Sequence, residues 1–174
     1  MKKSSPKKTK SILDPLISII MGSDSDLKVM REAAQILDSA QVPYEIKIVS
    51  AHRTPQEMQK FALQAPTRGI RIIIAGAGGA AHLPGMVASL TSLPVIGVPI
   101  QVGNLEGLDA LLSIAQMPRG VPVATMAVDN ATNAGLMAIR ILALQTPSLQ
   151  HWLKKYRDGQ KLKVRRANEA LDPS

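Results

Sequence analysis

Residues 70–82 read Ile-Arg-Ile-Ile-Ile-Ala-Gly-Ala-Gly-Gly-Ala-Ala-His, an apolar run that passes directly into a chain of small residues. Strands read as continuous apolar runs when both faces of their sheet are covered, as in parallel sheets packed between helices. A glycine-rich turn allows the main chain to approach a ligand closely. The stretch therefore predicts a buried parallel strand at 70–75, followed by a loop suited to ligand binding.

Similar apolar runs lie on both sides of this stretch, at residues 16–21, 45–50, 94–99 and 123–128. Helical patterns alternate with them at about 25–40, 55–66, 81–91, 105–115 and 130–145. Ser25 and Asp26 are expected to cap the first helix, and Thr54 followed by Pro55 is a typical start for the second. The alternation predicts an α/β fold with three αβα layers and a flavodoxin-like, doubly wound, five-stranded parallel sheet.

The two ends of the chain differ from the body in charge. The formal net charge is +8, but residues 11–150 hold nine basic and ten acidic side chains. Residues 1–14 are predicted to be a basic, disordered tail, and residues 15–147 the catalytic α/β domain. Residues 148–174 are predicted to form an additional C-terminal helix and tail at a subunit interface. Leu149, Trp152 and Tyr156 would share one face of that helix.

Composition excludes several classes of partner. The basic residues lie at the two ends, and the chain has one Phe, one Trp and two Tyr, so stacking on nucleic acid is not expected. No apolar run reaches the roughly 18 residues of a membrane span, and no secretory signal follows the lysines. Because the chain has no cysteine, a cytoplasmic location is the default expectation.

Several kinds of chemistry are also excluded. Three histidines without any cysteine or His-x-x-x-His spacing predict no metal site. The chain has no phosphate-binding Gly-x-x-x-x-Gly-Lys-Ser/Thr loop and no Gly-x-Ser-x-Gly elbow. Gly76-x-Gly78-x-x-Ala81 fits the dinucleotide fingerprint only weakly, because it follows the third strand and no acid ends the next one. A phosphorylated sugar-like ligand, a proton carrier and no cofactor remain.

The distinctive polar and small residues follow the predicted strands. They occupy residues 22–26, 51–55, 76–82, 100–103 and 129–133. Open parallel sheets bind ligands beyond the carboxyl ends of their strands, and all these segments fall at that edge. The clustering predicts one site there.

Each loop leaves two interpretations open. Ser23 and Ser25 could bind a phosphate and Asp26 a ribose, or Ser25 and Asp26 could only cap a helix. His52 could transfer a proton beside a phosphate-binding Arg53, or both could be ordinary polar residues at a strand end. His82 could reach the ligand or only cap the turn that follows.

Five motifs together are similar to class I N5-carboxyaminoimidazole ribonucleotide mutases. They are Met21-Gly22-Ser23-Asp24-Ser25-Asp26, Ser50-Ala51-His52-Arg53-Thr54-Pro55, residues 75–85, residues 94–99 and residues 116–120. They occur in that family's order over about residues 16–145. Residues 128–135 depart from the family's pattern and are expected to be two residues shorter.

The resemblance implies a cofactor-free isomerase of purine biosynthesis that acts on a small ribonucleotide. It implies that His52 is the catalytic proton carrier and that the protein assembles as a homo-octamer with shared active sites. The substrate-binding residues that we predict are Ser23, Ser25, Asp26, Ser50, Ala51, Arg53, Ala77, Gly78, Gly79, His82 and Leu83. Direct carboxylation of aminoimidazole ribonucleotide with carbon dioxide is the alternative enzyme activity. A flavodoxin-like module that binds a nucleotide without turnover is a more distant alternative.

Overall fold

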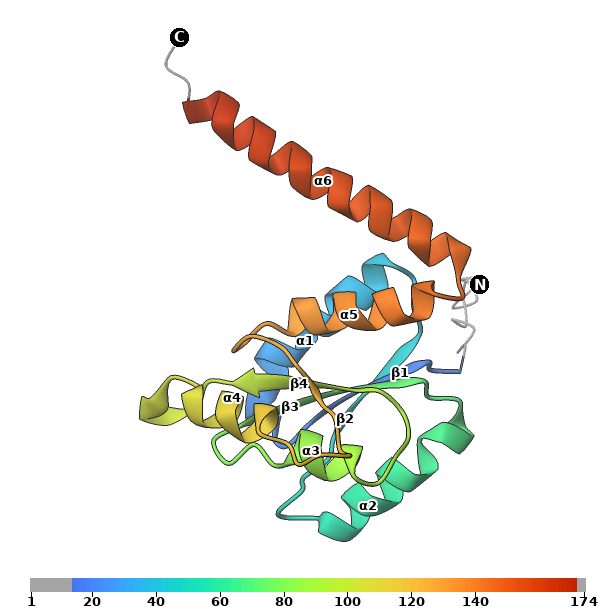
Figure 1. Ribbon diagram of the computed structural model, residues 1–174, viewed down its shortest axis with the longest axis vertical. Helices are drawn as coiled ribbons and strands as arrows, with labels where there is room; N and C mark the ends of the chain where they lie inside the picture. The colour runs from blue at the N-terminus through green and yellow to red at the C-terminus, as the bar shows by residue number, and fades with distance from the viewer. Residues whose placement is uncertain (1–13, 172–174) are drawn as a thin grey trace, which may run out of the picture.

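The computed structural model describes residues 14–171 of the 174-residue chain, which form a parallel sheet between two helical layers (Figure 1). The strands are β1 (Ile17–Met21), β2 (Tyr44–Ile48), β3 (Ile72–Gly78), β4 (Val95–Ile100) and β5 (Ala124–Thr125), in the order β2-β1-β3-β4-β5. The helices are α1 (Leu27–Ser39), α2 (Pro55–Gln64), α3 (Leu83–Ala88), α4 (Leu108–Ala115), α5 (Ala131–Ala143) and α6 (Pro147–Leu171). Short 3-10 turns are η1 (Asp24–Asp26), η2 (Pro66–Arg68) and η3 (Gly103–Leu105). The predicted three-layer, doubly wound fold is confirmed, and residues 1–13 of the predicted tail lie outside the described residues.

The central strands β1 and β3 are buried on both faces. Ile72 and Ile74 join the cluster under α1 and α5, whereas Ile73 and Ala75 join the cluster under α2, α3 and α4. All four side chains are fully buried. This two-sided burial is the physical reason for the continuous apolar run that we read in the sequence.

The sheet edges are less buried than the apolar runs predicted. Ile46 and Ile48 of β2 are 38% and 59% exposed, because β2 pairs only with β1. At the other edge, β5 comprises only Ala124 and Thr125, so the strand predicted over 123–128 was too long. An edge strand has a neighbour on one side only, and its apolar residues therefore need not be covered.

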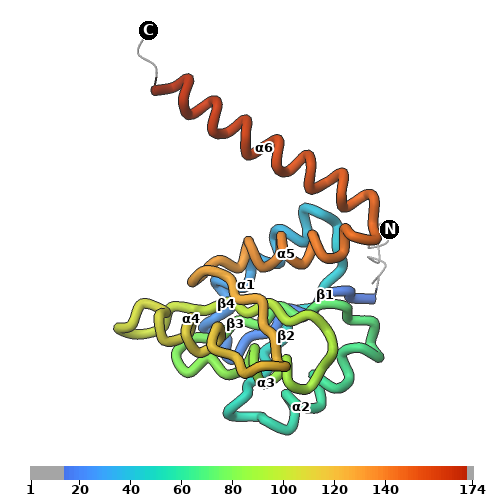
Figure 2. The backbone as a smooth tube through the Cα atoms, viewed as in Figure 1, coloured from blue at the N-terminus to red at the C-terminus, as the bar shows by residue number. Residues whose placement is uncertain are grey.

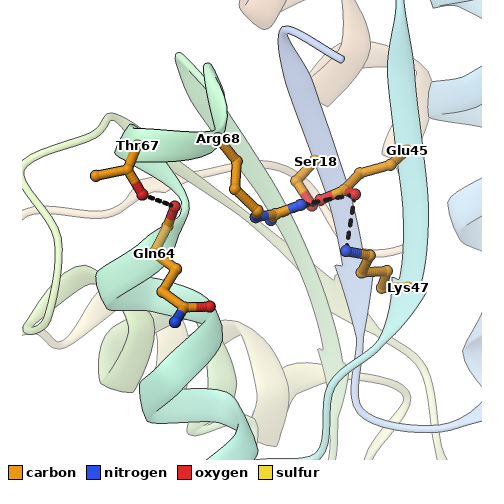
Figure 3. Close-up of polar contacts among 6 residues, drawn as sticks. All are labelled: Ser18, Glu45, Lys47, Gln64, Thr67 and Arg68. Carbon is orange, nitrogen blue, oxygen red and sulfur yellow. Dashed lines mark hydrogen bonds and ion pairs between the residues drawn. The ribbon is translucent and has the colours of Figure 1, made fainter. Parts of the chain in front are cut away.

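A charged network fixes the β2 edge to η2 (Figure 3). The Ser18 hydroxyl donates to Glu45 at 3.0 Å, Arg68 Nη1 donates to the same carboxylate at 2.9 Å, and Lys47 Nζ lies 2.8 Å from it. Burial alone would raise the pKa of Glu45, but the hydrogen bonds from Arg68, Lys47 and Ser18 outweigh it and lower that pKa to about 2. The network therefore holds an ionised carboxylate between β1, β2 and η2.

Helix α6 begins against the α/β domain and then extends away from it (Figures 1 and 2). Leu149 is buried in the cluster under α1 and α5, and the indole of Trp152 donates to the Ser39 carbonyl at 2.9 Å. Trp152 also stacks on Tyr156, as their shared face predicted. Residues 157–171 are exposed. None of the helices within residues 14–171 is long and apolar enough to cross a membrane.

Candidate active site

The loops after β1, β2 and β3 meet where the strand order reverses. Met21 is in register with Ile48 on one side and Gly76 on the other, so the three loops start at the same level of the sheet. They enclose a pocket of about 240 Å³. Its lining residues are Gly22, Ser23, Ser25, Asp26, Ser50, Ala51, His52, Arg53, Ala77, Gly78, Ala80, His82, Leu83 and Val102. Ligands bind at this point in doubly wound sheets.

Every predicted site residue except Gly79 lines this pocket. Gly79 has a positive φ of 61° and turns the chain beside it. We did not assign Gly22, Ala80 and Val102 to the site, although each follows a strand at the edge where we expected ligands. Their side chains carry no reactive group, so only their position after a strand could have identified them as pocket residues.

The first loop is a helix start closed by a capping box. The Ser23 hydroxyl accepts from the Ser25 amide at 3.4 Å, and the Asp26 carboxylate accepts from the Ser23 amide at 3.1 Å. The expected cap at Ser25 was wrong, because Ser25 lies inside η1 and donates its hydroxyl to Asp26 at 3.2 Å. Asp26 has no side-chain bond at the start of α1 and closes the box one turn earlier. The loop thus combines a structural cap with a polar pocket wall.

The two carboxylates of the first loop differ in environment. Asp26 is only 5% exposed, and the loss of water raises its pKa despite hydrogen bonds from Ser25 and Ser23. The exposed Asp24 accepts from the Ser23 hydroxyl at 3.0 Å, and that bond together with amide hydrogen bonds lowers its pKa. The buried Asp26 is therefore the carboxylate that faces the pocket and can accept from ligand hydroxyls.

Arg53 joins the loops after β1 and β2. Its Nη2 donates to the Gly22 carbonyl at 3.0 Å, and its Nε donates to the Ser50 hydroxyl at 3.4 Å. The Ser50 hydroxyl also accepts from the Arg53 amide at 3.2 Å. A guanidinium has five N–H donors, so these bonds fix its plane while further donors can face an anion.

His52 and His82 face each other across the pocket. His52 Nε2 lies 2.8 Å from His82 Nδ1, and the rings meet edge to face with their planes 88° apart. A neutral histidine has one donor and one acceptor nitrogen, so one ring donates to the other. His82 occupies the position before α3 but makes no side-chain cap bond. Of its two predicted roles, the capping one is therefore wrong, and its ring lies in the pocket beside His52.

The carboxyl end of β3, where the third loop begins, is built from small residues because its neighbours are close. A Cβ at Gly76 would lie 2.3 Å from Met30 Sδ, and one at Gly78 would lie 2.9 Å from the Ile100 carbonyl oxygen. Larger side chains would displace β4 and α1 from β3. The loop therefore presents main chain rather than side chains to the pocket.

A larger hollow of about 920 Å³ lies at the opposite, amino end of the strands, between the α1–β2 connection and the start of α6. It is lined mainly by apolar side chains such as Leu16, Leu142 and Trp152, with Arg71 and Lys155 at its exposed rim. The smaller pocket is the better candidate because it brings together two histidines, an arginine and a buried carboxylate. Within residues 14–171, no group of three or more His, Asp or Glu side chains is placed to hold a metal ion.

Comparison with known sequences gives one consistent family. The AIR carboxylase family matches residues 16–163. N5-carboxyaminoimidazole ribonucleotide mutase from Pyrococcus horikoshii is 60% identical over 158 residues, which are 91% of this chain and 89% of that protein. The protein of the same name from Thermotoga maritima is 56% identical over 91% of this chain and 92% of its own length.

Other relatives differ in length or are known as structures. Chloroplastic phosphoribosylaminoimidazole carboxylase from Vigna aconitifolia is 56% identical over 93% of this chain, which spans only 29% of that protein. The crystal structure of Treponema denticola PurE has a TM-score of 0.83 at 27% identity, over 91% of this chain and 99% of that one. These matches cover the sheet and all three loops of the pocket.

Proposed function

Because the chain belongs to the AIR carboxylase family, we propose that it converts N5-carboxyaminoimidazole ribonucleotide into 4-carboxy-5-aminoimidazole ribonucleotide. The reaction is an isomerisation in purine biosynthesis that moves one carboxyl group from nitrogen to carbon. The proposal rests on the name shared by relatives that are 56–60% identical over most of their length. The carboxylase name comes from proteins of which this chain spans less than a third.

The substrate is expected to place its phosphate by the first two loops. Ser23 and Ser25 offer hydroxyls near the start of α1, where main-chain N–H groups favour an anion. Arg53 supplies the positive charge, with its plane fixed by Ser50 and Gly22. The ribose hydroxyls then lie in reach of Asp26, which faces the same pocket.

His52 carries the proton in both chemical steps. It first protonates the nitrogen that bears the carboxylate, the N–C bond breaks, and carbon dioxide and aminoimidazole ribonucleotide form. The electron-rich ring carbon then attacks carbon dioxide, and His52 removes the proton from that carbon. The proton returns to its starting place, so the isomerisation consumes none and uses no cofactor.

The carbon dioxide must stay in the pocket between the steps. The main chain of Ala77 and Gly78 and the buried side chain of Leu83 line the pocket beside His82, and Gly79 turns the chain next to this wall. Carbon dioxide that stays bound in the pocket reacts at a high effective concentration, so the enzyme does not depend on carbon dioxide dissolved in the solvent. In the empty site, His82 keeps the reactive nitrogen of His52 paired. The position of His52 in the pocket, with its Nε2 2.8 Å from His82 Nδ1, is the geometric observation that supports its role.

An assay with two substrates tests the function. The purified protein is given either the carbamate substrate or aminoimidazole ribonucleotide with bicarbonate, and carboxylated product is measured. Faster conversion of the carbamate is the expected result. Equal or slower conversion of the carbamate would instead support direct carboxylation. If neither substrate were converted, the result would support a module that binds the nucleotide without turnover.

We further propose that the protein works in the cytoplasm as a homo-octamer. Support for assembly comes from exposed apolar side chains, among them Leu105, Leu108 and Leu112 around α4 and Val164 on α6. Exposed apolar surface of this kind is typical of subunit contacts. The cytoplasmic assignment is supported by the absence of cysteine.

A further inference from the structure

The loop after α4 packs on α3, away from the substrate pocket. Met117 belongs to the segment Gln116-Met117-Pro118-Arg119-Gly120, which the substrate pocket does not use. A Cβ built on Gly85 would lie 2.6 Å from Met117 Sδ and 2.8 Å from its Cε. The thioether therefore occupies the space that any larger residue at position 85 would need.

Gly85 lies in the turn that carries His82. Helix α3 has only six residues, and His82 immediately precedes it, with its carbonyl accepting from the Met86 amide at 2.9 Å. So short a helix has few hydrogen bonds of its own, and packing must hold it in place. Leu83, Pro84 and Gly85 are all buried, so the first turn is held from several sides.

Met117 and His82 also share one hollow. Its volume is about 410 Å³, and it is lined by His82, Gly85, Met86, Ser89, Ser113 and Met117. His82 therefore has His52 on one side and a methionine-lined wall on the other. Methionine is flexible and polarisable and fills irregular gaps of this kind.

We propose that Met117 is a positioning residue that packs on Gly85 and thereby holds His82 against His52. The expected kinetic effect rests on the proposed function, whereas the packing of Met117 on Gly85 involves only residues of this chain. A misplacement of His82 changes the catalytic step more than substrate binding, since the phosphate contacts lie on other loops.

A double-mutant cycle tests the contact in the full-length protein. Met117→Ala empties the space over Gly85, and Gly85→Ala forces Met117 away. Each is expected to lower kcat for the carbamate by at least about tenfold with little change in KM, because small displacements in an active site have large kinetic effects. In the double variant the new methyl group takes up part of the vacated space, so kcat is expected to recover partly. Met117→Leu, which keeps the volume, is expected to stay close to the parent protein.

Two further measurements separate this proposal from a general loss of stability or function. Met137→Ala removes an equally half-buried methionine from the opposite layer and should leave kcat unchanged. The ring ¹⁵N chemical shifts of His52 and His82 should change in Met117→Ala and return towards the parent values in the double variant, even if the carbamate is not the substrate. Unchanged kcat and shifts in both single variants, or additive losses in the double variant, would overturn the proposal.

Discussion

His52 Nε2 and His82 Nδ1 lie 2.8 Å apart, although thirty positions separate these residues in the chain. The contact exists because β1 lies between β2 and β3 and brings the loops after both strands to one edge. Each ring reaches the pocket from a different loop, so the pair depends on the sheet order rather than on local sequence.

The histidine contact predicts a role for His82 in catalysis. His82→Phe keeps an aromatic side chain but lacks both ring nitrogens, so His52 loses its partner and its fixed orientation. We expect kcat to fall by about tenfold to a hundredfold while substrate affinity changes little. Steady-state kinetics on the carbamate measure both quantities. His151→Phe, at an exposed position near the start of α6, is the matched control, and an equal loss in that variant would contradict a specific role for His82.

The two hydrogen bonds of Arg53 predict that substrate binding requires the planar shape of its guanidinium as well as its positive charge. Arg53→Lys keeps the charge but cannot bind the Gly22 carbonyl and the Ser50 hydroxyl in one plane. We expect substrate affinity to fall by about tenfold or more in Arg53→Lys and further in Arg53→Ala. Titration calorimetry with the ribonucleotide measures the change, with Arg140→Lys on α5 as control. Normal affinity in Arg53→Lys would remove the arginine from the phosphate site.

The charged network predicts a loss of stability in acid. The pKa of Glu45 is lowered from 4.5 to about 2 in the folded protein, so its contribution is complete above about pH 5. That contribution disappears as the pH falls through the range between 4.5 and 2, since the unfolded state then binds the proton more tightly. Because Lys47 and Arg68 are partly exposed, screening limits it to about 1–2 kcal/mol.

Urea unfolding at pH 7 and pH 3 tests this contribution. Glu45→Gln should lower the free energy of unfolding at pH 7 and reduce its fall towards pH 3. Glu57→Gln is the control, because Glu57 is exposed at the start of α2. The same pH dependence in Glu45→Gln as in the parent protein would show that the network does not stabilise the fold.

Helix α6 predicts an effect on assembly. Residues 157–171 are exposed, so ending the chain at Tyr156 should leave the fold of the subunit intact and weaken the proposed oligomer. Sedimentation velocity measures the assembly, and circular dichroism measures the melting temperature. An octamer that persists without residues 157–174 would contradict the proposed interface role of this helix.

The buried part of the fold could be predicted from sequence, because central strands such as β3 need apolar residues on both faces. The edges could not, since Ile46 and Ile48 read like core residues but lie on a strand with one neighbour. The same apolar run can be covered or exposed, and only the strand order decides which.

The site shows the same division. The presence of Ser23, His52 and Arg53 at this pocket could be predicted, because they follow strands and carry polar or charged groups. Val102 could not be assigned in this way, because its side chain carries no reactive group. The contact between His52 and His82 could not be predicted either, because it depends on how close two separate loops lie in the fold. The sequence also did not determine that Ser23 rather than Ser25 is the capping residue, since both serines precede the same helix.

The most direct test of the central claim is turnover of the carbamate by His52→Asn, measured beside ribonucleotide binding by calorimetry. Asparagine keeps a polar side chain of similar reach but cannot carry a proton. If His52 transfers the proton in both steps, affinity stays close to that of the parent protein and turnover falls by about a hundredfold or more. Undiminished turnover in His52→Asn would contradict the mechanism.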